Sequence, residues 1–238
     1  MCIRDRSEPG NPGGAKPTAA GRLLELPVFD PGVHYGSVYL WYDTSAQRER
    51  PGGYSTTAPK SAKPVAQQLE PLNCGDWTGN AGRLVDRLGI GSIALHRGLY
   101  LRNPAVPSTA WFAWHALLEQ GWTVQRTAGP VWVFERRSIG LQPALLEPSR
   151  RRPVFCQGWY GDTGTGRYMS ETHAPFWVYG GGKVRLQFAP SPLHRRVTVH
   201  GGDKVGWHLV TVDVPRLRRV AGQPRAVGLQ LVRVESSR

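Results

Sequence analysis

The stretch Leu84-Val85-Asp86-Arg87-Leu88-Gly89-Ile90-Gly91-Ser92-Ile93-Ala94-Leu95-His96 decides the fold of the first part of the chain. The first residues of this stretch belong to a segment, 81–88, whose apolar residues have the spacing of one face of a helix. Gly89 is typical of a helix end. Residues 90–96 then form a continuous apolar run of the kind found in buried strands. A helix followed directly by a buried strand indicates layered α/β structure.

The segments around this stretch complete one domain. We predict further elements at 23–28 (strand), 63–72 (helix), 109–120 (helix), and 122–126 with 131–136 (a hairpin). The order strand, helix, helix, strand, helix, hairpin predicts a small mixed-sheet α/β sandwich over residues 21–137.

The second part of the chain contains only strand-like segments. A Pro- and Arg-rich stretch over 138–152 is expected to be a linker. Five apolar runs separated by turn residues follow it, and side chains alternate between apolar and polar over 184–188 and 227–234. This pattern predicts an antiparallel β-sandwich over residues 153–238, of a jelly-roll or carbohydrate-binding type.

The beginning of the chain is not expected to belong to either domain. Residues 1–6 look like a translated sequencing adaptor, so the natural start is expected to be missing. Residues 7–20 are rich in Pro, Gly and Ala, which is a linker composition. We therefore expect 1–20 to be an artefact followed by a disordered linker. No apolar stretch is long enough to span a membrane.

The net charge of +13 has two interpretations. Five of the 30 basic residues are lysines, so 25 are arginines, as a GC-rich genome would give on a solvated surface. The other interpretation is an anionic partner, such as lipid headgroups or a phosphate-bearing polymer. We do not expect nucleic acid, because most of the arginines are scattered along the sequence.

Two cysteines remain when Cys2 is assigned to the adaptor. Cys74 and Cys156 have no zinc-type spacing, and they could form a disulfide if the chain is extracytoplasmic. The closed loop would then contribute about 4.5 kcal/mol in the chain-entropy model. The alternative is two unrelated buried thiols.

No motif for catalysis, metal binding or a cofactor is found in the sequence. The stretch 161–166 resembles the Asp-Thr-Gly of aspartic proteases, but as a single copy it is expected to be a turn, and 180–182 a hairpin turn. The seven histidines have no ligand spacing. We therefore expect no catalytic residue, no metal and no cofactor in this chain.

Aromatic residues give the only candidate binding sites. Tyr39 and Tyr42 lie in a run of aromatic and small polar residues, which Tyr54 and Ser55 follow after a gap, and Trp177 belongs to an aromatic set in the second domain. Sugar rings stack on the faces of aromatic side chains, and small polar residues beside them can bind the hydroxyls. The alternative is that these aromatics form the core.

Four short segments carry a resemblance to a known family: 23–27, 39–42, 53–55 and 88–96. Together they resemble the extracytoplasmic C-terminal region of polytopic bacterial membrane glycosyltransferases of the GT-C type, which use polyprenyl-phosphate sugar donors. The resemblance covers about residues 23–136, and the second domain resembles β-sandwiches appended to some of these enzymes.

The resemblance implies a non-catalytic fragment of an enzyme, at the outer face of the plasma membrane. Its partners would be a glycan or lipid-linked sugar, the missing N-terminal transmembrane region and the membrane surface. Tyr39, Tyr42, Tyr54, Ser55 and His96 are the residues that would contact the ligand. A structural turn at 53–55 and a core His96 are the alternative. Two other functions stay open: a secreted carbohydrate-binding protein, and the partner-contact region of a membrane protein of unknown activity.

Overall fold

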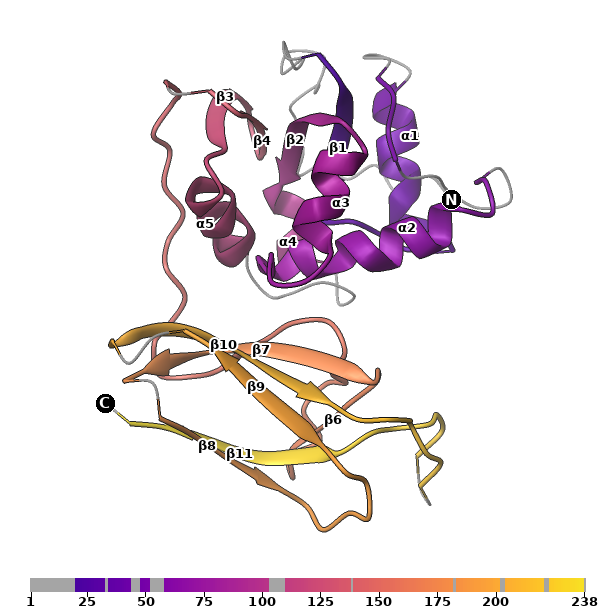
Figure 1. The fold of residues 1–238 in the computed structure, drawn as a ribbon, viewed down its shortest axis with the longest axis vertical. Coiled ribbons are helices and arrows are strands. Elements are labelled where there is room, and N and C mark those ends of the chain that lie inside the picture. The colour runs from indigo at the N-terminus through magenta and orange to yellow at the C-terminus, as the bar shows by residue number, and fades with distance from the viewer. Residues whose placement is uncertain are drawn as a thin grey trace. The chain divides into compact units, whose positions relative to one another are not determined.

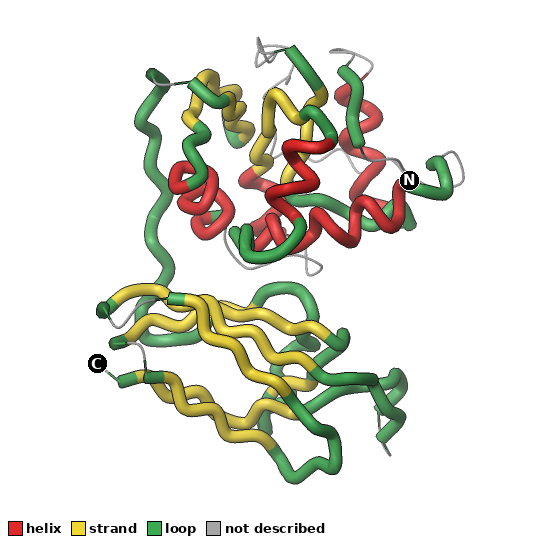
Figure 2. The backbone as a smooth tube through the Cα atoms, viewed as in Figure 1, coloured by secondary structure: helices red, strands yellow, loops and turns green. Residues whose placement is uncertain are grey.

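The computed structural model describes residues 20–32, 34–43, 48–51, 58–102, 110–137, 139–181, 183–201, 204–220 and 223–237. The chain divides into two compact units, residues 1–147 and 148–238. We call them the α/β unit and the β unit and describe each by itself (Figures 1 and 2). Among the described residues, no helix combines the length and the apolar character needed to cross a bilayer.

The α/β unit is built on a four-stranded mixed sheet with the order β1-β2-β4-β3. β1 runs parallel to β2, and the other neighbours are antiparallel. The elements in chain order are β1 (Arg22–Leu26), η2 (His34–Gly36), α1 (Ser37–Asp43), α2 (Ala62–Leu69), η4 (Glu70–Cys74), α3 (Ala81–Arg87), β2 (Ile90–His96), α4 (Arg97–Arg102), α5 (Trp111–Glu119), β3 (Thr123–Ala128) and β4 (Val131–Glu135).

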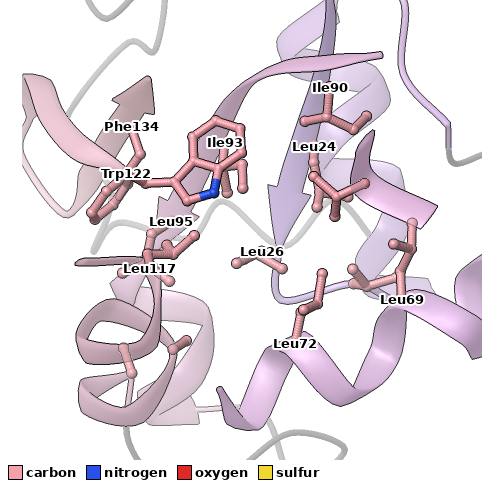
Figure 3. Close-up of a cluster of buried hydrophobic side chains, with 14 of the residues drawn as sticks. Leu24, Leu26, Leu69, Leu72, Ile90, Ile93, Leu95, Leu117, Trp122 and Phe134 are labelled. Carbon is pink, nitrogen blue, oxygen red and sulfur yellow. The ribbon is translucent and has the colours of Figure 1, made fainter. Parts of the chain in front are cut away.

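Alternation along the strands gives this sheet two different faces. Leu24, Leu26, Ile93 and Leu95 point to the main core, which the helices cover and which also holds the fully buried Trp122 (Figure 3). The opposite face carries a smaller apolar cluster. It also carries the buried polar side chains of Glu25 and His96, which alternate with those leucines.

The predicted elements of the α/β unit mostly form as expected, with differences at helices. β2 has the predicted bounds, but the helix expected over 63–72 ends at Leu69 and continues as η4, where Pro71 cannot supply the next backbone N–H. Ser108, which precedes the helix predicted over 109–120, lies outside the described residues. Two helices, α1 and α4, are not among the predicted elements.

The β unit contains two antiparallel sheets, β5-β7-β10-β9 and β6-β11-β8, around one apolar core. Its strands are β5 (Val154–Phe155), β6 (Arg167–Tyr168), β7 (His173–Gly180), β8 (Val184–Phe188), β9 (Arg196–His200), β10 (Gly206–Asp213) and β11 (Gln230–Ser236). Phe176, Val210 and Leu229 are fully buried in this core. The molecule is therefore a mixed α/β unit followed by an antiparallel β unit, as predicted at this level.

One alternation pattern in the β unit is broken. The pairing of β11 with β8 shifts between Leu231 and Arg233, and the extra residue, Val232, is 45% exposed. A β-bulge of this kind turns the following side chains to the other face. Strict alternation from Leu231 would place Arg233 on the core side. Because of the bulge, Val234 packs against the core instead.

Candidate functional site

A buried carboxylate, Glu25, is the centre of the polar site in the α/β unit. Glu25 lies in β1 between leucines, and it is 8% exposed. One of its oxygens, Oε2, is 2.6 Å from Nε2 of His96, and the other, Oε1, accepts a hydrogen bond of 3.0 Å from Nε of Arg50. A buried carboxylate is costly unless it is paired, so both partners are needed to keep Glu25 in the sheet.

The pKa of Glu25 reports the balance of these forces. Burial acts to raise the pKa of this carboxyl group, because it disfavours the charged form. The charges and hydrogen bonds of His96 and Arg50 together outweigh burial, and the pKa is lower than that of an ordinary glutamate. At neutral pH Glu25 is therefore ionised and bound to its two partners, and it is not a proton donor.

Tyr39 of α1 closes one side of this polar site. Its ring lies 5.0 Å from the His96 ring and 5.7 Å from the Phe29 ring, between centroids. Its hydroxyl donates a hydrogen bond of 2.7 Å to the backbone oxygen of Pro27. The hydroxyl is therefore already occupied by the protein, and the ring is 9% exposed.

The segment 48–51 runs beside β1 and brings Arg50 to Glu25. The backbone N–H of Leu23 donates to the oxygen of Glu49 at 2.9 Å, and the Glu49 carboxylate pairs with Arg22 at 2.6 Å. Arg50 also donates to the backbone oxygen of Arg48 at 3.1 Å. The Glu25–Arg50 pair thus ties this loop segment to the edge of the sheet.

A cavity of about 320 Å³ lies between β1, α1, α2 and the segment 48–51. Most of its lining is apolar, and its charged lining residues are Glu25, Arg48, Glu49 and Arg50. The remaining lining residues are Leu23, Leu24, Val28, Phe29, Gly36, Tyr39, Leu40, Pro51, Val65, Ala66 and Leu69. An apolar cavity with a few charged groups on one side suits an amphipathic ligand.

The structure brings together only part of the predicted ligand site. Tyr39 lines the cavity, and His96 is 1% exposed behind Glu25. Tyr42 belongs to α1, but its side chain lies outside the described residues, as do Tyr54 and Ser55 entirely. Their predicted contacts with a ligand stay predictions.

The aromatic residues of the β unit divide into core and half-exposed positions. Trp159 packs edge-to-face on Phe155 and Phe176, and its indole N–H donates to the backbone oxygen of Pro175 at 3.0 Å. Trp159 is therefore half-buried and packs against the core of the β unit. Trp177 is half-buried in β7 and does not line the cavity described above.

Sequence reasoning missed Glu25 and Arg50. A lone acidic residue inside the apolar run Leu23–Leu26 was the available signal, because a carboxylate in a buried strand requires a cationic partner. No sequence signal identifies Arg50 as that partner, since it lies 25 residues away in a loop.

The two cysteines are buried in different units. Cys74 ends η4 and is 0% exposed, and Cys156 follows β5 and is 6% exposed. Each is disulfide-bonded in the structure. Their pairing with each other stays a prediction, and peptide mapping by mass spectrometry without a reducing agent checks it.

The stretch 161–166 contains a turn, as predicted, whereas the predicted turn over 180–182 lies partly outside the described residues. Thr163 closes a tight turn by donating its N–H to the oxygen of Gly166 at 3.1 Å, and Asp162 accepts the N–H of Gly164 at 2.9 Å. Within the described ranges, no three His, Cys, Asp or Glu side chains gather as metal ligands would.

Comparisons with protein-family models, with curated proteins and with solved structures give no match for this chain.

Proposed function

We propose that this chain is the non-catalytic extracytoplasmic region of a membrane glycosyltransferase, and that the cavity of the α/β unit binds a lipid-linked sugar. The observation that carries the proposal is the composition of the cavity wall. Its surface is mainly apolar, and two arginines, Arg48 and Arg50, belong to its polar side.

The apolar wall favours a lipid-linked ligand over a free glycan. Phe29, Leu40 and Val65 offer no hydrogen bonds, whereas a site for a bare sugar needs several polar groups for the hydroxyls. A prenyl chain gains free energy from such a surface by leaving water. The cavity therefore suits the first isoprene units of a polyprenyl chain.

The arginines suit the phosphate of such a ligand. A guanidinium group matches a phosphate with two parallel hydrogen bonds. Arg50 is bound to Glu25, and Arg48 is half-buried in the same cavity wall, so both guanidinium groups lie at the polar edge of the cavity. The polar edge of the cavity would then hold the phosphate, with the sugar beyond it.

The proposal assigns no chemistry to this region. Glu25 is a buried acid in the cavity wall, and its lowered pKa keeps it ionised between His96 and Arg50, so it is not suited to act as a general acid at neutral pH. The chemical step would belong to the transmembrane region. In this proposal the β unit is a carbohydrate-binding sandwich of the jelly-roll type, and both units lie at the outer face of the membrane.

Binding of farnesyl phosphate, measured by isothermal titration calorimetry, tests the cavity. We expect Val65→Phe, which fills the cavity, and Arg48→Ala, which removes a cation, each to weaken binding by about tenfold or more. Arg87→Ala is the matched control, because Arg87 is exposed on α3 and does not line the cavity. Tight binding of a methyl glycoside without binding of farnesyl phosphate would instead support a carbohydrate-binding protein.

The parent enzyme is tested separately by recovering the reading frame upstream of Ser7. Several apolar spans with an acidic residue in the first outer loop would support the glycosyltransferase. A signal peptide without spans would overturn it, and spans without that acidic residue would favour a membrane protein of another activity.

A further inference from the structure

The positive charge of the chain is concentrated in the β unit. The α/β unit has 15 basic and 12 acidic residues, a net charge of +3, whereas the shorter β unit has 15 basic and 5 acidic residues, a net charge of +10. A genomic preference for arginine codons acts on both units alike. It does not explain why the β unit is poor in acidic residues.

The fold gathers arginines that the sequence separates. β10 ends at Asp213, which is paired with Arg196 at the start of β9. The loop before β9 and the loop after β10 therefore leave the unit at the same end, which the course of the strands in Figure 1 also shows. We call this end the basic end, and it is defined by Arg195, Arg196, Arg216, Arg218, Arg219 and Arg225.

The six arginines of the basic end have no carboxylate partner in the part of the chain that the structure describes. The nearby carboxylate of Asp213 is paired with His173 at 2.7 Å. Arg195 is exposed, and its guanidinium carbon lies 4.7 Å from the centre of the Phe188 ring.

Apolar side chains accompany these arginines. Val197 and Val199 of the edge strand β9 are 41% and 39% exposed, on the face of that strand opposite to Arg196. Cations beside exposed apolar residues are typical of surfaces that meet lipid headgroups. Single-stranded nucleic acid would require exposed aromatic rings, and the large exposed hydrophobic residues described in this unit are all valines.

We propose that the basic end of the β unit binds the anionic headgroups of a lipid bilayer. This inference stands on the charges of the β unit and does not depend on the cavity of the α/β unit. It makes the β unit a membrane-surface contact in addition to any role with glycans.

Vesicle co-sedimentation of the full chain tests the proposal. We expect binding to vesicles of phosphatidylglycerol and phosphatidylcholine, weak binding to phosphatidylcholine alone, and loss of binding in salt well above about 0.1 M. Replacing Arg196, Arg216, Arg219 and Arg225 by Ser should weaken binding by about a hundredfold, because each cation near an anionic surface contributes to the attraction.

The matched control removes four charges from the opposite end of the same unit. Arg151, Arg152, Lys183 and Lys204 are exposed there, near the start of β5 and in the loops that follow β7 and β9. Their replacement by Ser should weaken binding by less than about threefold. Equal losses in the two variants would overturn the basic end as a site. Tighter binding to inorganic polyphosphate or a DNA oligonucleotide than to vesicles would overturn the lipid partner.

Discussion

In the α/β unit Glu25 is enclosed between His96 and Arg50, whereas in the β unit Arg216 and Arg219 extend from a loop without a carboxylate partner among the described residues. The first arrangement is buried and fixes a loop segment against a strand. The second is exposed and fixes nothing among the residues that the structure describes. Buried paired charges therefore shape the cavity, and exposed unpaired charges are available to a partner.

The difference also concerns what holds each unit together. Burial of a charge makes its pairing essential, because water cannot replace a lost partner. Exposed ion pairs such as Arg233–Glu235 are screened, and they contribute little to stability. We therefore expect the α/β unit to be sensitive to charge changes and the β unit to packing changes.

Removing the buried carboxylate should have the largest effect. We expect Glu25→Ala to lower the free energy of unfolding by about 3 to 5 kcal/mol, because it leaves His96 and Arg50 buried without their shared anion. The matched change in the β unit, Glu235→Ala, should cost at most about 0.5 kcal/mol. Urea unfolding measures both, and similar losses would break the comparison.

The second-largest loss of stability is expected from a substitution at Gly201 in the β unit. Gly201 has φ of 145°, and a Cβ there would overlap Nδ1 of His208, whose Nε2 lies 2.8 Å from the Gly180 oxygen. We expect Gly201→Ala to cost about 2 to 4 kcal/mol from strain and overpacking.

The control for Gly201 is Gly206→Ala in β10, where a Cβ would meet no atom within 4 Å. This change should lie within about 0.5 kcal/mol of the parent chain. Equal urea midpoints for the two variants would show that His208 moves aside freely, and the β unit would then be less dependent on packing than we argue.

Lowering the pH should remove the stabilisation that ionised Glu25 gives to the α/β unit. The pKa of Glu25 is lowered in the folded chain, so its ionised form stabilises the fold at every pH above the ordinary glutamate value of 4.5. This stabilisation is lost as the pH falls below that value and through the lowered pKa. Unfolding midpoints of the parent chain and Glu25→Gln from about pH 6 to about pH 3 measure it. The difference between the two should shrink on acidification, and a constant difference would contradict the ionised Glu25.

Most of the strands could be predicted from the sequence, because their signal is local. The apolar run of β2 and the alternation of β8 are sufficient to place them. The bulge at Val232 and the short strands β5 and β6 could not be predicted, since they depend on the partner strand and not on their own residues.

The candidate site was less predictable than the fold for the same reason. Tyr39 and His96 were recognised as residues of interest, but the arrangement depends on Glu25 and Arg50, which meet only when the loop folds against β1. The basic end could not be predicted for the same reason, because Arg196 and Arg216 are 20 positions apart and come to the same end of the unit only through the β9–β10 pairing.

The smallest effect that we expect comes from Glu171, the β unit's counterpart to Glu25. Burial raises the pKa of Glu171, and the nearby His173 opposes this without overcoming it. An acid whose folded pKa is raised destabilises the fold while it is ionised, so acidification relieves a cost. Glu171→Gln should therefore raise the urea midpoint slightly at neutral pH, and the gain should vanish as the pH falls below the ordinary glutamate range. A lower midpoint would show that the attraction of His173 outweighs the partial desolvation of this surface-exposed glutamate, and that an exposed charge also contributes to the stability of the β unit.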